Sequence, residues 1–231
     1  MATVTPLNSP LTHASVFPAD WTVADMQEHL GGIALERILV VPPPGTATVD
    51  DVERFRNTTG RICELVDGTL VEKAVGYFES RLAAVLIHFI ERYLDTARLG
   101  MVLAPDGTLN ILSGVVRAAD VSFISWQRLP NGELPTKPIP ELVPDLAVEV
   151  LSRGNTKAEM QRKLHEFFQA GVRLVWLIDP KTCTATVYTT PEQTAHLNRD
   201  GVLSGGEVLP GFKLSLEELF SRAEPPKPAN D

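Results

Sequence analysis

The stretch that decides the fold runs from residue 144 to residue 180 and reads PDLAVEVLSRGNTKAEMQRKLHEFFQAGVRLVWLIDP. Its apolar runs at 145–151 and 174–178 show little alternation of polar and apolar residues, which is typical of strands covered on both faces. Between them, Thr156 to Ala170 places apolar residues at helical spacing, and Gly171 is positioned as the C-cap. A strand, a helix and a strand in this order predict two parallel strands joined by a right-handed crossover.

Two carboxylates interrupt apolar runs that read as strands. Glu149 lies inside the run 146–151, and Asp120 ends the run 115–120. A carboxylate in a buried strand is costly unless it is paired, hydrogen-bonded or bound to a metal. Lys163 lies at the margin of the apolar stripe of the predicted helix, so its ammonium can reach the sheet while its stem follows the core. These residue types suggest a hard-metal phosphodiesterase site.

A plainer alternative explains the same residues. Asp120 and Glu149 could form buried ion pairs with Arg117, Arg153 or Lys163, because structural ion-pair networks also occur. Lys163 could instead pair with Glu159 one helical turn away. The remaining polar residues of the predicted helix are expected to face outward: Arg162, His165, Glu166 and Gln169.

The other elements of the main domain follow from turn signals and periodicity. Asp67-Gly68 between two β-rich runs is a strong hairpin signal. Gly76 to Ala97 repeats apolar residues at helical spacing. Further strands are expected at 61–66, 69–73, 100–103, 108–112, 119–125 and 184–188, with a short closing helix at 215–220. The predicted fold class is α/β, with a mixed, partly parallel central sheet flanked by helices.

The chain divides into four predicted parts. These are a mobile N-terminal leader (1–18), an accessory N-terminal segment (19–58), the main domain (59–222) and a flexible tail (223–231). In the accessory segment, Thr22 is placed to cap a helix that runs to Leu30 and is stopped by glycines. We also expect a strand at 38–41 and a helix at 48–56.

Composition bounds the class of protein. The chain has 231 residues, of which 44% are hydrophobic and 22% charged, as in ordinary soluble globular proteins. It has no apolar run of membrane-spanning length and no signal pattern, which predicts a cytoplasmic protein without a membrane partner. Cys63 and Cys183 do not make a disulfide framework or a zinc site. The net charge of −8 argues against a broad nucleic-acid-binding surface and leaves local patches for such contacts.

Several stretches together resemble a known family. They read ELVDG at 64–68, VRAADVSF at 116–123, PDLAVEVLS at 144–152, Lys163, AGVRLVWLIDP at 170–180 and LPGF at 209–212. In this order they are similar to the Uma-two family, which is grouped with restriction endonucleases in the PD-(D/E)XK nuclease superfamily. The resemblance covers about residues 60 to 220.

The resemblance implies a restriction-endonuclease fold and a Mg²⁺-dependent (or Mn²⁺-dependent) endonuclease that hydrolyses phosphodiester bonds, in DNA. Asp120 and Glu149 would be metal ligands, together with the backbone carbonyl of Val150. The superfamily lysine would have moved from the strand position of Leu151 to Lys163 on the helix, where it would orient the attacking water.

Two further acidic residues enter through the resemblance. Glu64 and Glu79 occupy positions where the family carries an acidic or polar residue facing the site, and Glu64 could hold a metal-bound water or a second ion. Their plainer readings are a solvated hairpin residue for Glu64 and a helix N-terminal carboxylate for Glu79. The chain departs from the family at Ala119, usually proline, and at Glu79, often histidine. Asp145 is expected to start a strand rather than to bind metal.

Two questions on function stay open at this point. A homodimer would give the two sites needed to cut both strands of DNA. A catalytically inactive nucleic-acid-binding or interaction module that retains the nuclease fold is the alternative to an enzyme, because fold does not fix function.

Overall fold

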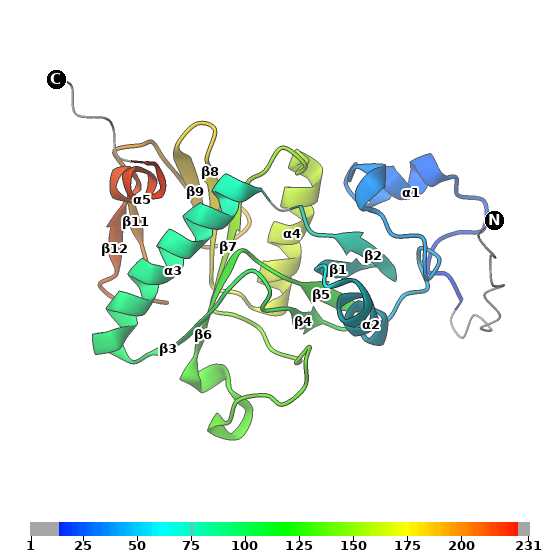
Figure 1. Ribbon diagram of the computed structural model, residues 1–231, viewed down its shortest axis with the longest axis horizontal. Helices are drawn as coiled ribbons and strands as arrows, with labels where there is room; N and C mark the ends of the chain where they lie inside the picture. The colour runs from blue at the N-terminus through cyan, green and yellow to red at the C-terminus, as the bar shows by residue number, and fades with distance from the viewer. Residues whose placement is uncertain (1–13, 75, 226–231) are drawn as a thin grey trace.

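The computed structural model of the protein describes residues 14–74 and 76–225, and its centre is a six-stranded mixed sheet (Figure 1). The strand order in this sheet is β10-β9-β8-β7-β6-β3. The strands are β3 (Gly100–Leu103), β6 (Val121–Ser125), β7 (Leu146–Val150), β8 (Leu174–Asp179), β9 (Thr184–Tyr188) and β10 (Thr194–Leu197). The predicted mixed α/β fold is therefore confirmed.

The crossover predicted from residues 144–180 is present. Helix α4 (Lys157–Ala170) joins β7 to β8, and these two strands pair in parallel. The hydroxyl of Thr156 caps the helix by accepting a hydrogen bond from the Glu159 amide at 3.0 Å. The helix ends at Gly171, whose φ of 99° lies in the left-handed region that glycine adopts readily. All five residues of β7 are buried, as expected of a strand covered on both faces.

The two faces of the central sheet are covered differently. One face packs against α3 (Tyr77–Ala97), α5 (Leu216–Ala223) and a hairpin of β11 (Val202–Ser204) and β12 (Lys213–Ser215). The other face packs against α4 and residues of a second sheet. In Figure 1, α3 crosses in front of the central sheet, and α4 stands between that sheet and the second one.

The second sheet has four strands in the order β2-β1-β5-β4. Its strands are β1 (Cys63–Val66), β2 (Thr69–Glu72), β4 (Leu109–Leu112) and β5 (Val115–Arg117). The predicted hairpin is confirmed, because Asp67 and Gly68 join β1 to β2 with φ values of 44° and 62°. Positive φ at both central residues is the geometry that two-residue hairpins favour.

The accessory segment contributes three short helices. They are α1 (Val23–His29), capped by Thr22 as predicted, the single 3-10 turn η1 (Leu35–Arg37) and α2 (Val49–Thr59), which packs on β1. Two further 3-10 turns, η2 (Trp126–Arg128) and η3 (Pro130–Gly132), lie between β6 and β7. Residues 1–13 of the predicted leader and 226–231 of the predicted tail lie outside the described residues.

The predicted strand at 38–41 is wrong. Only Ile38 forms a bridge, to Val71, and the chain then continues without strand pairing. Three prolines follow directly at 42–44, and proline has no amide hydrogen with which to extend a ladder. β5 lies within the run 115–120 that reads as a strand, whereas the short strands β10, β11 and β12 have no counterpart among the predicted ones.

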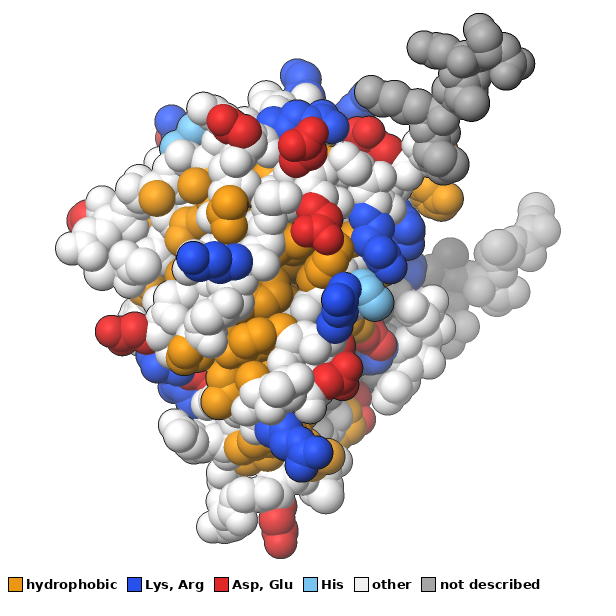
Figure 2. Space-filling view, turned by 90° about the vertical axis from the view of Figure 1, so that its left-hand side faces the viewer, with side chains coloured by type: hydrophobic (Ala, Val, Ile, Leu, Met, Phe, Trp, Pro, Cys, Tyr) orange, Lys and Arg blue, Asp and Glu red, His pale blue; other side chains and the backbone are white. Residues whose placement is uncertain are grey.

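The lengths of the helices and the charges on the surface match what the composition predicts. No helix of the described chain is long and apolar enough to cross a membrane. On the face shown in Figure 2, the described Lys and Arg side chains are interspersed with Asp and Glu around exposed hydrophobic side chains. A mixed surface of this kind agrees with the expectation that any contact with nucleic acid is local.

The packing of α4 on the sheet can be tested at one position. Phe167→Ala should lower the free energy of unfolding by about 3–5 kcal/mol, because Phe167 is 1% exposed and lies in the core between α4 and the sheet. His165→Ala, on the exposed side of the same helix, should change it by less than about 0.5 kcal/mol. Urea denaturation measures both, and equal losses would contradict this packing.

Candidate active site

Asp120 lies between two strands rather than within one. The predicted strand at 119–125 begins at Val121, so Asp120 occupies the bend that leads from β5 into β6. Its amide donates to the Val148 carbonyl at 2.9 Å, and its Oδ2 accepts from the Val150 amide at 2.7 Å. These two bonds hold the Asp120 main chain and its carboxylate beside the end of β7.

Glu149 faces α4. Ala147 packs in the core cluster that contains Leu164 of α4, and alternate residues of a strand share a face. The Lys163 ammonium lies 3.1 Å from Glu149 Oε1 and 3.0 Å from Glu64 Oε1. The structure therefore brings together the lysine and two of the predicted acidic residues from a helix, a central strand and the second sheet.

Glu64 is not a solvated hairpin residue. It is 1% exposed, and its Oε2 accepts from the Arg117 guanidinium at 2.8 Å. Its Oε1 accepts from the Ala118 amide at 3.1 Å in addition to Lys163. Every oxygen of this carboxylate therefore has a donor, as a buried charge requires.

Glu166 does not face outward, as was expected. It is 8% exposed and pairs with the Arg117 guanidinium. Arg162 is likewise partly buried, and it bonds to Asp67 of the hairpin at 2.6 Å. The second sheet packs against this side of α4, and helical periodicity alone gave no sign of that partner.

Lys73 is a site residue that the sequence did not reveal. Its ammonium lies 3.0 Å from Asp120 Oδ1 and also donates to the Ala118 carbonyl, and the side chain is almost fully buried. Asp120 therefore pairs with a lysine that was not among the candidate partners. The only signal was the position of Lys73 directly after the hairpin, and that position is shared by many exposed lysines.

The charges of the site act strongly on one another. Burial would raise the pKa of Glu64, but Lys163 and Arg117 outweigh it and hold that pKa well below its ordinary value. Burial would lower the pKa of Lys163, but Glu149 and Glu64 raise it above its ordinary value. Burial raises the pKa of Glu149 above its ordinary value; Lys163 and Lys73 oppose this rise, and Asp120 and Glu64 add to it.

The donor set fits a hard cation in kind, although it is small. Among the described residues no group of three or more His, Cys, Asp and Glu side chains could hold a metal ion. Asp120 and Glu149 supply oxygen donors only, which is what Mg²⁺ and Mn²⁺ prefer.

Two other acidic residues lie outside this group. Asp145 precedes β7 as expected, where it accepts from the Ser125 amide at 2.8 Å and pairs with Arg128 and Arg173. These contacts give it a structural task in joining three segments. Glu79, in the first turn of α3, is only partly buried and lines a cavity.

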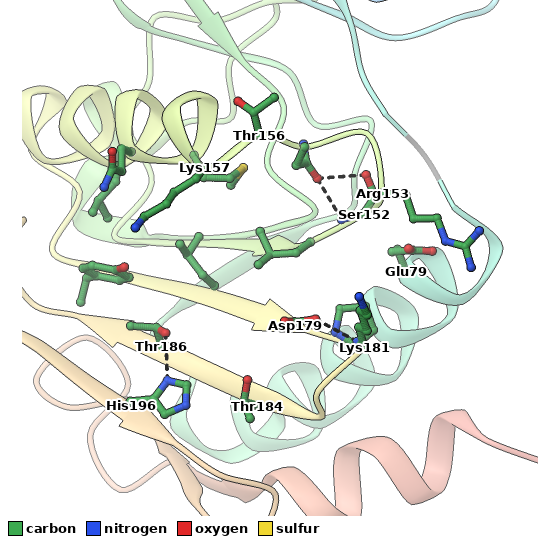
Figure 3. A pocket seen from close by; sticks show the side chains of 18 of the residues that line it. Glu79, Ser152, Arg153, Thr156, Lys157, Asp179, Lys181, Thr184, Thr186 and His196 are labelled. Carbon is green, nitrogen blue, oxygen red and sulfur yellow. Dashed lines mark hydrogen bonds between the residues drawn. The ribbon is translucent and has the colours of Figure 1, made fainter. Parts of the chain in front are cut away.

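That cavity has a volume of about 1030 Å³ and lies beside α4, over the sheet face formed by β8, β9 and β10. None of Asp120, Glu149 and Lys163 lines it, and all three are buried. Figure 3 shows Lys157 at one side of the cavity and Lys181 at its far end. The lining also includes Leu151 and Ser152, which directly follow β7, so the cavity adjoins the segment that ends the candidate site.

The accessory segment supports the start of α4. The Arg37 guanidinium pairs with Glu159 at 2.8 Å and donates to the Gly154 carbonyl at 3.0 Å and to the Glu72 carbonyl at 2.9 Å. Gly31, with φ of 90°, lies so close that a Cβ there would be 2.8 Å from the Glu159 amide nitrogen. The chain before β1 thus fixes the first turn of the helix that carries Lys163.

The mixed central sheet flanked by helices is the architecture expected of the restriction-endonuclease class. The model of the Uma2 family, described as "Putative restriction endonuclease", matches residues 49–217. The chain belongs to this family, and the Uma-two resemblance seen in the sequence is confirmed.

One solved structure similar to the chain is that of a protein from Anabaena variabilis, described as "a putative nuclease belonging to DUF820". The TM-score is 0.64 and the sequence identity 22%, over 72% of this chain and 93% of that chain. At this identity the likeness supports the fold. No curated protein matches the sequence.

The buried ion pairs predict a pH-dependent effect of Glu64→Gln. At pH 7 this change should lower the free energy of unfolding by about 3–5 kcal/mol, because Arg117 and Lys163 lose a buried partner. The Glu64 pKa is lowered in the folded protein, so its contribution is full above its ordinary value of 4.5 and is lost as pH falls below it. The difference in the free energy of unfolding between variant and wild type should be about 1.4 kcal/mol smaller at pH 3.5 than at pH 7.

Urea denaturation at the two pH values measures this gap. Glu141→Gln is the matched control, because its side chain is 75% exposed and its pair with Lys137 is on the surface. The control should change stability by less than about 0.5 kcal/mol at either pH. A gap for Glu64→Gln that stays constant with pH would contradict the charged state assigned to Glu64.

Proposed function

We propose that this protein is a metal-dependent endonuclease that hydrolyses phosphodiester bonds, with DNA as its substrate. The observation that carries the proposal is the meeting of Asp120, Glu149 and Lys163 at the end of β7, with 3.1 Å between the Lys163 ammonium and Glu149. The family to which the chain belongs, with its description as restriction endonucleases, supports the same class of reaction.

Asp120 and Glu149 would hold Mg²⁺ or Mn²⁺, with the backbone carbonyl of Val150 as a third oxygen donor. When bound, the ion supplies Lewis-acid stabilisation of the charge that develops on the phosphate. Asp120 is already oriented for this role, because its Oδ2 accepts from the Val150 amide. The chain thus places both carboxylates before any ligand arrives, which lowers the cost of ordering them.

Lys163 would orient the attacking water and stabilise negative charge on the phosphate in the transition state. Its ammonium is fixed by two carboxylates, so it keeps its proton at neutral pH. Both oxygens of Glu64 are already engaged by Lys163, Arg117 and the Ala118 amide. We therefore assign Glu64 the task of positioning these cations rather than of binding a second ion.

The strand of nucleic acid beside the scissile bond would lie in the cavity next to α4. Lys157 and Lys181 place exposed positive charge at its two sides, and Leu151 and Leu177 add apolar surface against which a base can pack (Figure 3). Glu79 lines the same cavity and would lie near the incoming substrate. Two copies of the chain would supply the two sites needed to cut both strands.

One observation favours the alternative, an inactive module that retains the nuclease fold. Asp120 pairs with Lys73 and Glu149 pairs with Lys163, so both carboxylates have a cationic partner without a metal. Buried ion pairs of this kind also occur where they only hold a fold together. The two functions differ in whether a divalent ion supports cleavage.

Cleavage of a supercoiled plasmid in Mg²⁺ or Mn²⁺ tests the enzyme directly. Asp120→Asn, Glu149→Gln and Lys163→Met should each slow cleavage at least about a hundredfold, because each removes a group that binds the ion or stabilises charge. Glu133→Gln, an exposed carboxylate between β6 and β7, should cleave like wild type. Circular dichroism checks that each variant is folded. Unchanged cleavage in the three site variants would rule out this site, and no metal-dependent cleavage by wild type would favour the inactive module.

The placement of the nucleic acid makes a separate prediction. Lys157→Met and Lys181→Met should each weaken the binding of a DNA duplex and reduce the slope of log affinity against log salt by about 1, the effect of losing one phosphate contact. Fluorescence anisotropy without divalent ions measures affinity while no cleavage occurs. Lys213→Met, on β12, is the matched control and should leave affinity and slope unchanged. Equal effects at all three lysines would place the nucleic acid elsewhere.

A further inference from the structure

Two lysines, rather than one, stand at the candidate carboxylates, and their surroundings differ. The Lys163 ammonium contacts two carboxylates, Glu64 and Glu149, which hold it in place from both sides. The Lys73 ammonium contacts one carboxylate, Asp120, and one neutral oxygen, the Ala118 carbonyl. Lys163 is thus in direct contact with two carboxylates, and Lys73 is in direct contact with one.

The position of the Lys73 ammonium is the one a cation would take on Asp120. Of the two Asp120 oxygens, Oδ2 is committed to the Val150 amide, and Oδ1 receives the ammonium at 3.0 Å. Oδ1 is the oxygen without a backbone hydrogen bond, and an ion that binds Asp120 through it would approach the Lys73 ammonium directly. A divalent cation and an ammonium in contact with the same carboxylate would repel each other across a few ångström.

At Lys73 the main chain is anchored, and only the side chain reaches Asp120. Lys73 lies just beyond the end of β2, and its amide is held by the Ile62 carbonyl at 3.0 Å. The main chain is thus anchored while the long side chain alone forms the contact with Asp120. A lysine side chain has four rotatable carbon–carbon bonds, so its ammonium can move without the hairpin moving.

We propose that Lys73 is a tethered counter-ion of Asp120 that competes with the divalent ion for Oδ1 and is displaced when the ion binds. This inference rests on the proposed function, in that it takes Asp120 as a metal ligand. Without an ion, the ammonium compensates a buried carboxylate that would otherwise be left unpaired. When an ion is bound, the ion compensates the Asp120 charge in place of the ammonium. Lys73 is therefore a positioning residue that sets how tightly the site takes up a metal.

The test is the affinity for Mn²⁺ alone, measured by isothermal titration calorimetry on the full chain. Lys73→Met should lower the Kd at least about tenfold relative to wild type, because it removes the competing charge in direct contact with Asp120. Lys73→Arg keeps a charge that cannot be lost by deprotonation and should bind with a Kd near that of wild type. Lys213→Met removes one charge at an exposed position on β12 and should leave the Kd unchanged. Asp120→Asn identifies which part of the heat belongs to this site.

Every result of this titration either supports or overturns the inference. Tighter binding by Lys73→Met, or Asp120-dependent binding by that variant where wild type shows none, supports the inference. Asp120-dependent binding by wild type that is equal or weaker in a folded Lys73→Met variant overturns the inference and leaves the proposed function standing. No Asp120-dependent binding in any variant overturns both.

A second measurement uses wild type and does not depend on the variant folding. In a crystal structure at saturating Mn²⁺, the Lys73 ammonium should lie beyond hydrogen-bonding distance of Asp120 Oδ1. An ion bound to Asp120 with the Lys73 contact intact would overturn the displacement.

Discussion

The Arg117 guanidinium is the contact on which the arrangement of the site depends. It extends from β5 to Glu64 on β1 and to Glu166 on α4, so one side chain joins the second sheet to the crossover helix. A cation with so little exposure would be very unfavourable alone, and it persists because carboxylates surround it. Glu64 in turn fixes Lys163. The orientation of Lys163 toward Glu149 therefore depends on Arg117, whose own side-chain partners are Glu64 and Glu166.

Charge balance connects the structure to both functional readings. The buried cations Lys73, Lys163 and Arg117 lie among four carboxylates, which are Asp120, Glu149, Glu64 and Glu166. The partly buried Arg162 also pairs with Glu166, so four cations face four carboxylates. Each buried charge therefore has an opposite charge beside it, as burial requires. The same arrangement serves as a structural ion-pair network and, under the proposed function, would receive a metal ion.

How far the sequence predicted this structure depended on whether a signal was local. The crossover helix, its C-cap at Gly171 and the Asp67-Gly68 hairpin are each set by neighbouring residues, and all three predictions were correct. Residues 38–41 look like a strand in composition, yet the prolines after them stop the pairing.

The failures at the site have a common cause. Glu166 was expected to be exposed and Lys73 was not noticed, since both are buried by segments far away in the sequence. Helical periodicity finds the face that meets the central sheet, and it cannot show that a second sheet covers the opposite flank. The meeting of Glu149 with Lys163 was predictable because the crossover places the helix directly over its own strand.

The contacts at the start of α4 have a consequence for grafting and truncation. Gly31 and Arg37 lie before residue 49, where the match to the family begins, yet they border the first turn of the helix that carries Lys163. The region that matches the family therefore lacks two residues, Gly31 and Arg37, that position the start of the helix carrying Lys163 in this chain. A transplant of residues 49–217 alone would leave Glu159 without the Arg37 guanidinium, at the head of the helix that carries Lys163.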